Sequence, residues 1–174
     1  MTDYILIEKI WQDIFCYQVK ITCASSHVVA TNDIYISDDS IDTLFNGLND
    51  FIKGKTKEFF WENGKKGDDS TACITFEFIH KDKLGHILIE VYMELDDGGN
   101  YSSHNCCFYL NTEIGLLEKF CQKLPTLKRE LLGIEVVLNL PFSEHIMPQM
   151  MEECLRYYVL EYHIDGFRFD LMGI

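Results

Sequence analysis

The fold is decided by three alternating segments, Thr71-Ala-Cys-Ile-Thr-Phe-Glu-Phe-Ile-His80, His86-Ile-Leu-Ile-Glu-Val-Tyr-Met-Glu-Leu95 and His104-Asn-Cys-Cys-Phe-Tyr-Leu-Asn111. Successive side chains of a β-strand point to opposite faces, so each segment places its apolar residues on one face and its polar residues on the other. Two polar loops, 81–85 and 96–103, join the segments. The stretch therefore predicts an antiparallel β-meander with one buried face and one wet face.

The residues before the meander predict a strand pair and a helix. Segments 16–23 and 27–37 alternate in the same way and are typical of paired strands, whereas 3–13 fits either a helix or a strand. Ser37 is a candidate N-cap, and the apolar residues that follow are spaced as on one face of a helix that ends at Gly54. The aromatic run 59–61 predicts an edge strand before the Asn63-Gly64 turn.

The residues after the meander predict a second helix and a last strand. Thr112 is a candidate cap for this helix, and Pro125 stops or offsets it. A turn or two follows up to Gly133, and 134–140 is a possible last strand. The sequence shows no internal repeat. We expect an α+β domain over residues 1–138, with a mainly antiparallel sheet covered by two helices, and a helix–strand appendage over residues 139–174.

Composition narrows the class of protein. The chain has 174 residues, of which 47% are hydrophobic, so a folded core is expected and disorder is excluded. There is no apolar run of about 18 residues and no basic segment at the N-terminus, which argues against a membrane span and a signal peptide. Seven cysteines, an odd number without a Cys-x-x-Cys pair, indicate a reduced protein rather than a disulfide framework. These features predict a cytoplasmic protein.

The net charge of −13 restricts the possible partners. A field of this sign repels nucleic acids and anionic membranes and favours a basic protein partner. Solubility alone explains the charge equally well. The lysines between 53 and 66 are offset by neighbouring acids, so they predict no nucleic-acid patch.

The other candidate sites do not complete a known pattern. His104 and Cys106 share a strand face, but Cys107 points away and no second pair supplies four zinc ligands. The loop 96–100 lacks the spacing of a calcium loop, and there is no glycine-rich phosphate loop. A Cys–His nucleophile pair has no local signature here. We therefore predict no metal and no cofactor.

Residues 10–132 resemble the WapI-type immunity proteins, which are small cytosolic antitoxins of bacterial contact-dependent toxin systems. The resemblance rests on the order of a strand pair, a helix beginning Ser37-Asp-Asp-Ser-Ile-Asp-Thr-Leu44, the segment Phe60-Trp61-Glu62, a hairpin containing Gly85-His86, a third strand and a helix. It implies an α+β domain that binds and blocks a toxin domain, often a nuclease, without catalysis of its own.

Exposed acids and aromatic residues are the candidate partner-binding residues. The acids would cover a basic groove and speed association, and the aromatic residues would be the desolvated anchors of an interface. Trp61, Tyr92 and Tyr101 are the aromatic candidates, and Glu90 and Glu94 are expected to be exposed as well. The acidic candidates are Asp38, Asp39, Glu62, Asp68, Asp69, Asp96 and Asp97. An ordinary acidic surface over an aromatic core is the alternative.

The last residues resemble a different family. A helical segment, 143–162, runs into His163-Ile-Asp-Gly-Phe-Arg-Phe-Asp-Leu-Met-Gly-Ile174, which resembles the barrel-strand motif of type I pullulanases in the α-amylase superfamily. By resemblance Asp170 matches the carboxylate nucleophile, and Arg168 matches the arginine that holds it ionised.

This ending is not expected to act as an enzyme. Retaining glycoside hydrolysis needs a second carboxyl group about 5–5.5 Å from the first. A complete (β/α)₈ barrel takes roughly 250 residues, of which 139–174 would supply one helix and one strand. The alternative function is thus an inactive fragment of a pullulanase-type hydrolase. Because the segment 143–169 is rich in apolar residues, we also expect it to dock on the domain, to self-associate or to aggregate.

Overall fold

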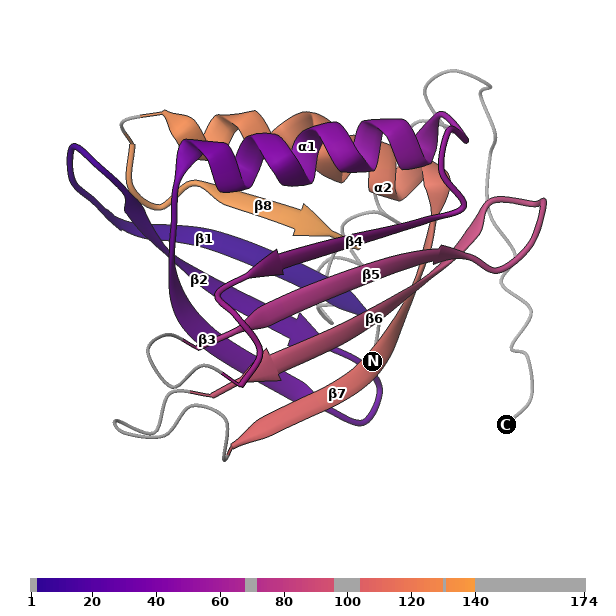
Figure 1. Cartoon of the computed structure of the whole chain (residues 1–174), viewed down its shortest axis with the longest axis horizontal. Coiled ribbons are helices and arrows are strands. Elements are labelled where there is room, and N and C mark those ends of the chain that lie inside the picture. The colour runs from indigo at the N-terminus through magenta and orange to yellow at the C-terminus, as the bar shows by residue number, and fades with distance from the viewer. Residues whose placement is uncertain (1–2, 68–71, 96–103, 130, 140–174) are drawn as a thin grey trace, which may run out of the picture. The chain divides into compact units, whose positions relative to one another are not determined.

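The computed structural model describes residues 3–67, 72–95, 104–129 and 131–139 (Figure 1). All of them belong to the first of two compact units into which the chain divides, Met1–Pro141 and Phe142–Ile174. The appendage predicted for residues 139–174, apart from Asn139, lies outside the described residues.

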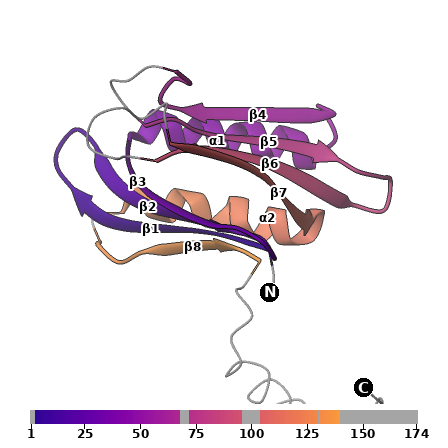
Figure 2. The ribbon, with the colours of Figure 1, turned by 90° about the horizontal axis from the view of Figure 1, so that it is seen from below.

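Within the described residues the chain forms two four-stranded antiparallel sheets, two α-helices and a short 3₁₀ helix. Figures 1 and 2 show the two sheets facing each other, with the helices side by side along one end. Sheet A has the order β3-β2-β1-β8, with the strands β1 (Tyr4–Gln12), β2 (Tyr17–Ala24), β3 (Val29–Ile36) and β8 (Glu135–Leu138). Sheet B has the order β4-β5-β6-β7, with the strands β4 (Glu58–Asn63), β5 (Ile74–His80), β6 (His86–Glu94) and β7 (Asn105–Glu113). The helices are α1 (Asp38–Ile52), α2 (Ile114–Lys123) and the 3₁₀ helix η1 (Leu124–Lys128).

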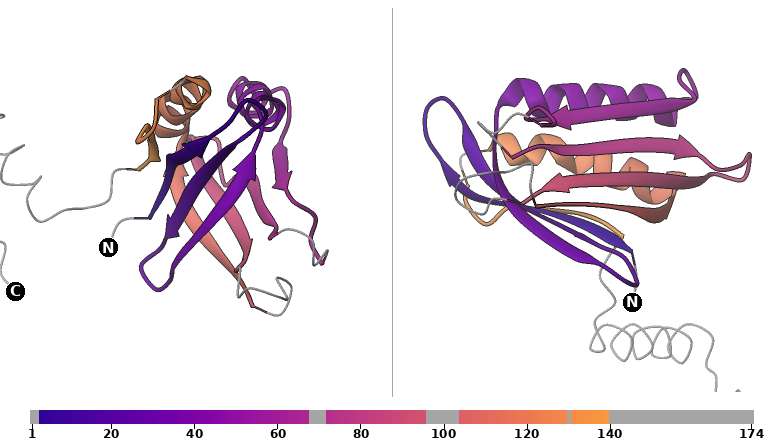
Figure 3. Two further views of the ribbon diagram at one scale, coloured as in Figure 1. Left: turned by 90° about the vertical axis from the view of Figure 1, so that its left-hand side faces the viewer. Right: turned by 60° about the horizontal axis from the view of Figure 1, so that its bottom comes forward.

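The element order repeats, although the sequence does not. Three antiparallel strands, a helix and a fourth strand form a first half, β1-β2-β3-α1-β4, and a second half, β5-β6-β7-α2-β8. The fourth strand of each half joins the sheet of the other half, because β4 pairs with β5 and β8 pairs with β1. The two halves therefore exchange their last strands (Figure 3).

The structure confirms the α+β class and the predicted meander. Strands β5, β6 and β7 pair in sequence, and Gly85 in the tight hairpin has the positive φ expected of it, +93°. Ser37 caps α1 by accepting a hydrogen bond from the backbone N–H of Ser40. The undecided segment 3–13 is a strand, β1, and β4 is an edge strand as predicted.

The prediction that Thr112 caps the second helix is wrong. Strand β7 continues through Thr112, and α2 starts one residue after Glu113, which makes no side-chain cap hydrogen bond. The Thr112 hydroxyl instead donates to Oδ1 of Asn139, 2.8 Å away, after β8. The hydroxyl is thus bonded to a residue distant in sequence and caps no helix.

The core lies between the two sheets and under the helices. Its rings include Phe51 of α1 and Phe76 and Phe78 of β5, which pack in tilted and edge-on pairs. A buried lysine, Lys9 of β1, also lies in this interior with no exposed surface. Its Nζ donates to the carbonyl oxygens of Leu127 and Arg129, at 2.9 and 2.5 Å, and so ties β1 to the segment that leads into β8.

Candidate partner-binding surface

On the outer face of sheet B, a row that crosses all four strands contains two acids and two aromatic residues. Phe60 of β4 is paired with Glu77 of β5, Glu77 with Glu90 of β6, and Glu90 with Tyr109 of β7. Cross-strand partners share a face of the sheet, so these four side chains stand side by side. We call them the acidic–aromatic row.

The centre of this row places two carboxylates opposite each other. Glu77 and Glu90 are direct cross-strand partners, and like charges in this arrangement destabilise a sheet. The Tyr109 hydroxyl donates to Oε2 of Glu90 at 2.8 Å. This hydrogen bond and the charge of Glu90 raise the pKa of Tyr109, so the phenol remains a donor at neutral pH.

The two ends of the row are exposed aromatic rings. Phe60 exposes 55% of its surface and Tyr109 exposes 51%. Glu58 and Glu62 flank Phe60 on the same face of β4, because they alternate with the inward residues of that strand. The row therefore has negative charge at its centre and exposed apolar surface at both ends.

Cations lie near the ends of this face and not in the row. None of the outward-facing residues of β4–β7 that the structure describes is a lysine or arginine. Lys66, in the loop after β4, places its Nζ 4.0 Å from the ring centre of Tyr92. Lys81, after β5, donates to Oδ1 of Asn111 at 3.1 Å. The carboxylates of the row therefore have no cationic partner on their own strands.

The prediction that Trp61 is an exposed anchor is wrong. The side chain is only 3% exposed and stacks on Phe76 in the core, with ring centres 5.6 Å apart. Its Nε1 donates to the carbonyl oxygen of Ser40 at 3.2 Å, which holds the first turn of α1 against β4. Strand alternation explains the error, because Trp61 faces inward between Phe60 and Glu62.

The predicted exposure of Tyr92 and Glu94 is also wrong. Tyr92 is 8% exposed and Glu94 is fully buried, although both point to the outer face of β6. Described residues between β4 and β5 contact both side chains: Lys66 lies over the Tyr92 ring, and Gly67 and Cys73 contact Glu94. Glu94 accepts hydrogen bonds from the Tyr92 hydroxyl and the backbone N–H groups of Gly67 and Cys73, at 2.9, 3.0 and 3.0 Å. This buried carboxylate binds Gly67 and Cys73 to the end of β6 and is unavailable to a partner.

A thiol, that of Cys73, is buried beside Glu94. Cys73 lies near Glu62, with Sγ 3.6 Å from Oε1. Burial, and then the charges of Glu62 and Glu94, raise the pKa of Cys73 to about 12. A thiol with so high a pKa is protonated at neutral pH and is a poor nucleophile.

The remaining predicted acids fall into two groups. Asp38 and Asp39 are exposed in the first turn of α1, where Asp38 accepts a hydrogen bond from the Tyr17 hydroxyl at 3.4 Å. Glu62 is exposed on β4, and the contact between Trp61 and Ser40 brings these acids to the same end of the unit. The other predicted residues lie outside the described residues: Asp68, Asp69, Asp96, Asp97, Tyr101, Arg168 and Asp170.

Sequence reasoning missed Phe60, Glu77 and Tyr109 as members of this surface. Alternation gave the outward direction of Glu77 and Glu90 but could not give their pairing. The register of β4–β7 creates the row, and a single strand does not reveal its register.

Residues 3–67, 72–95, 104–129 and 131–139 contain no group of three or more His, Cys, Asp or Glu side chains arranged to hold a metal ion. Cys106 packs against the core and Cys107 is exposed, as predicted for neighbours on a strand. None of the described helices has the length and apolar character to span a membrane.

Comparison of the chain with protein-family models, curated proteins and solved structures gave no match.

Proposed function

We propose that this protein is a non-catalytic immunity protein that binds and neutralises a bacterial toxin domain, a basic nuclease, through the outer face of sheet B. The observation that carries the proposal is the acidic–aromatic row. Two carboxylates stand opposite each other between the exposed rings of Phe60 and Tyr109. A basic partner would relieve the repulsion between Glu77 and Glu90. The free energy that this repulsion costs the free sheet would therefore favour binding.

The charge of the whole chain supports the same partner. With 28 acidic and 15 Lys and Arg residues, the protein attracts a basic domain over a distance of about one Debye length, roughly 8 Å at physiological salt. Carboxylates on the row, on β4 and at the start of α1 match the cations that a nuclease uses to bind phosphates. Such an arrangement blocks a nuclease by occupying its substrate groove.

The exposed rings supply the apolar part of the interface. Aromatic residues dominate the binding energy of many protein interfaces because their large surfaces are fully desolvated on binding. Phe60 and Tyr109 would be the aromatic anchors, in place of Trp61 and Tyr92, which the sequence predicts for this role. Tyr109 brings a hydroxyl that is already held by Glu90, so its ring is partly positioned before the partner arrives.

The alternative, an inactive fragment of a pullulanase-type hydrolase, rests on Arg168 and Asp170 and has no support from the described residues. A reducing-sugar assay on pullulan checks whether the chain turns over this substrate. Neither proposal predicts turnover, so activity on pullulan would contradict both.

The direct test is capture of the partner. The tagged full chain is used as bait in the source cells, the beads are washed at low and at high salt, and bound proteins are identified by mass spectrometry. We expect one basic toxin domain whose capture weakens as salt rises. Retention of no basic protein, or of a partner insensitive to salt, contradicts the proposal.

A charge-reversal variant locates the surface. Glu77→Lys/Glu90→Lys is compared with Glu118→Lys/Glu135→Lys, which makes the same change in net charge at exposed positions of α2 and β8. We expect the first variant to lower the association rate constant for the captured domain at least about tenfold, and the control to lower it much less. Equal effects of the two variants would show that only net charge matters and would remove the row from the proposal.

A further inference from the structure

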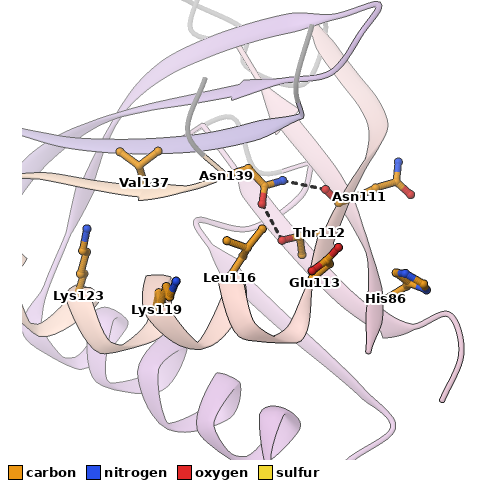
Figure 4. A pocket seen from close by; sticks show the side chains of 9 residues that line it. All are labelled: His86, Asn111, Thr112, Glu113, Leu116, Lys119, Lys123, Val137 and Asn139. Carbon is orange, nitrogen blue, oxygen red and sulfur yellow. Dashed lines mark hydrogen bonds between the residues drawn. The ribbon is translucent and has the colours of Figure 1, made fainter. Parts of the chain in front are cut away.

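A cavity of about 600 Å³ lies beside α2 and is lined by residues of β6, β7, α2 and β8 and by Asn139. Small-molecule sites in proteins have volumes of roughly 300–1,000 Å³ and combine apolar walls with a few polar groups. Figure 4 shows Leu116, Lys119 and Lys123 along one side of α2, directed towards the level of β8. Leu116 is 40% exposed, which is high for a leucine on a packed helix.

In the other half of the molecule, the corresponding side of the helix is covered. Counted from the N-caps Ser37 and Glu113, Leu116 and Lys123 occupy the positions that Ser40 and Gly47 occupy in α1. That side of α1 is covered by two rings of β4.

The first ring is that of Trp61, whose Nε1 donates to the Ser40 carbonyl oxygen. The second is that of Phe59, which lies so close to Gly47 that a Cβ there would meet its Cε2 at 2.0 Å. The corresponding inward residues of β8 are the smaller Val136 and Leu138. The second half thus has no aromatic residue where the first half has two.

The charge in this cavity is opposite to that of the whole protein. Lys119 and Lys123 lie one turn apart on α2, and neither makes an ion pair within the part of the chain that the structure describes. Lys123 also suits the negative end of the helix dipole, but Lys119 does not lie in the last turn. Glu113 is the one acid among the described lining residues, and the His86 ring is engaged by Asp82 at 2.5 Å.

A fixed polar corner closes one end of the cavity. Asn139 has a left-handed backbone conformation, with φ of 52°, which is uncommon for a residue other than glycine. Its side chain accepts from the Thr112 hydroxyl and donates to the Asn111 carbonyl oxygen, both at 2.8 Å. These two hydrogen bonds hold the amide in one orientation (Figure 4).

We propose that this cavity binds a small carboxylic acid with an apolar body. The body would lie against Leu116 and Val137, and the carboxylate would be bound by Lys119 and Lys123. At physiological salt the repulsion from the distant acids is screened beyond roughly 8 Å, so the two nearby cations decide the local charge. This inference does not depend on the proposed function.

The probe is decanoate, titrated calorimetrically into the full chain at physiological salt. We expect a dissociation constant on the order of 10–100 µM, which is typical of a ligand of this size. Decyltrimethylammonium, with a similar chain and the opposite charge, should bind at least about tenfold more weakly. Absence of decanoate binding, or equal binding of the two probes, overturns the proposal.

Two variants place the ligand. Lys119→Gln/Lys123→Gln should weaken decanoate binding about tenfold or more, because it removes both charge-assisted contacts. The matched control Lys57→Gln/Lys65→Gln removes two exposed lysines elsewhere and should leave binding unchanged. Leu116→Trp, which introduces the kind of ring that covers α1, should abolish binding while the unfolding temperature remains close to that of the wild type. If Lys119→Gln/Lys123→Gln binds decanoate as the wild type does, the site is not this cavity.

Discussion

Sheet A and sheet B are built alike, but their outer faces are not. In each sheet a row of four residues crosses the strands in equivalent order. Counted from the exchanged strand, which is β8 in sheet A and β4 in sheet B, the third position in sheet A is Lys20. It lies between Glu8 and Asp33 and so has an opposite charge on both sides. In sheet B the same position is Glu90, which lies between Glu77 and Tyr109.

The difference lies in how the charges of each row are paired. Glu8 of sheet A also faces an acid, Glu135, but Lys20 is its other neighbour and offsets both. Thr22 and Thr31 add a hydroxyl hydrogen bond of 3.0 Å on this face. The row in sheet A therefore has a cation among its acids, whereas the row in sheet B has two carboxylates side by side and no cation.

The largest expected effect concerns how each sheet holds the strand contributed by the other half. Lys9→Met should destabilise the protein by about 3 kcal/mol, because it leaves the carbonyl oxygens of Leu127 and Arg129 without a charged donor in a buried site. Trp61→Phe, which removes one donor from Ser40 at the β4 side, should cost about 1 kcal/mol. Urea denaturation measures both. Equal losses would contradict the special role of Lys9 in holding β8.

The next effect compares the two helices. Gly47→Ala should destabilise the protein by about 1–2 kcal/mol, because the added Cβ overlaps the ring of Phe59 and outweighs the gain in helix propensity. Gly115→Ala in α2 meets no atom within 4 Å and should stabilise by up to about 1 kcal/mol. The unfolding free energies of the two variants are compared directly. Stabilisation by both would mean that the side of α1 is not closed by Phe59.

Alkaline pH tests the two buried tyrosines, one in each half. Burial raises the pKa of Tyr17 beside Asp38, and burial and the hydrogen bond to Glu94 raise the pKa of Tyr92 to about 12. When a group has a higher pKa in the folded chain than in the unfolded chain, its contribution to stability is complete below the unfolded pKa. This contribution is lost as pH rises towards the folded pKa. Between pH 10 and 12 the wild type should therefore lose about 2 kcal/mol more than Tyr92→Phe. Parallel stability curves for the two proteins would show that Tyr92 is not responsible.

The smallest effect tests the charges of the two rows. Glu77→Lys should stabilise the free protein by about 0.5 kcal/mol, because it replaces a like-charge pair with an ion pair. Lys20→Glu in sheet A should destabilise by a similar amount, about 0.5 kcal/mol, because it makes all four residues of that row acidic. Thermal unfolding at low salt resolves the two signs, and high salt should reduce both. Shifts of the same sign would contradict the contrast between the sheets.

The sequence predicted the local elements well, because their signals are local. Alternation defined β5, β6 and β7, and the apolar spacing after Ser37 defined α1. The division of the strands into two sheets, with β4 and β8 exchanged, was not predictable in the same way. Alternation tells which face of a strand is buried but not which strand lies beside it.

The errors at the candidate site have the same cause. Tyr92 does point outward, as its place in β6 predicts, but a loop that starts some 25 positions earlier in the chain covers it with Lys66. Thr112 carries a cap signature, yet its hydroxyl bonds to Asn139. Only the folded chain brings these partners together, so no window of sequence contains the information.

Hydrogen–deuterium exchange of the full chain, free and bound to the captured toxin domain, tests the central claim most directly. Binding through the outer face of sheet B predicts added protection in peptides that cover β4–β7, centred on Phe60, Glu77, Glu90 and Tyr109, with β1–β3 unchanged. Protection confined to sheet A, or spread equally over both sheets, would contradict the account.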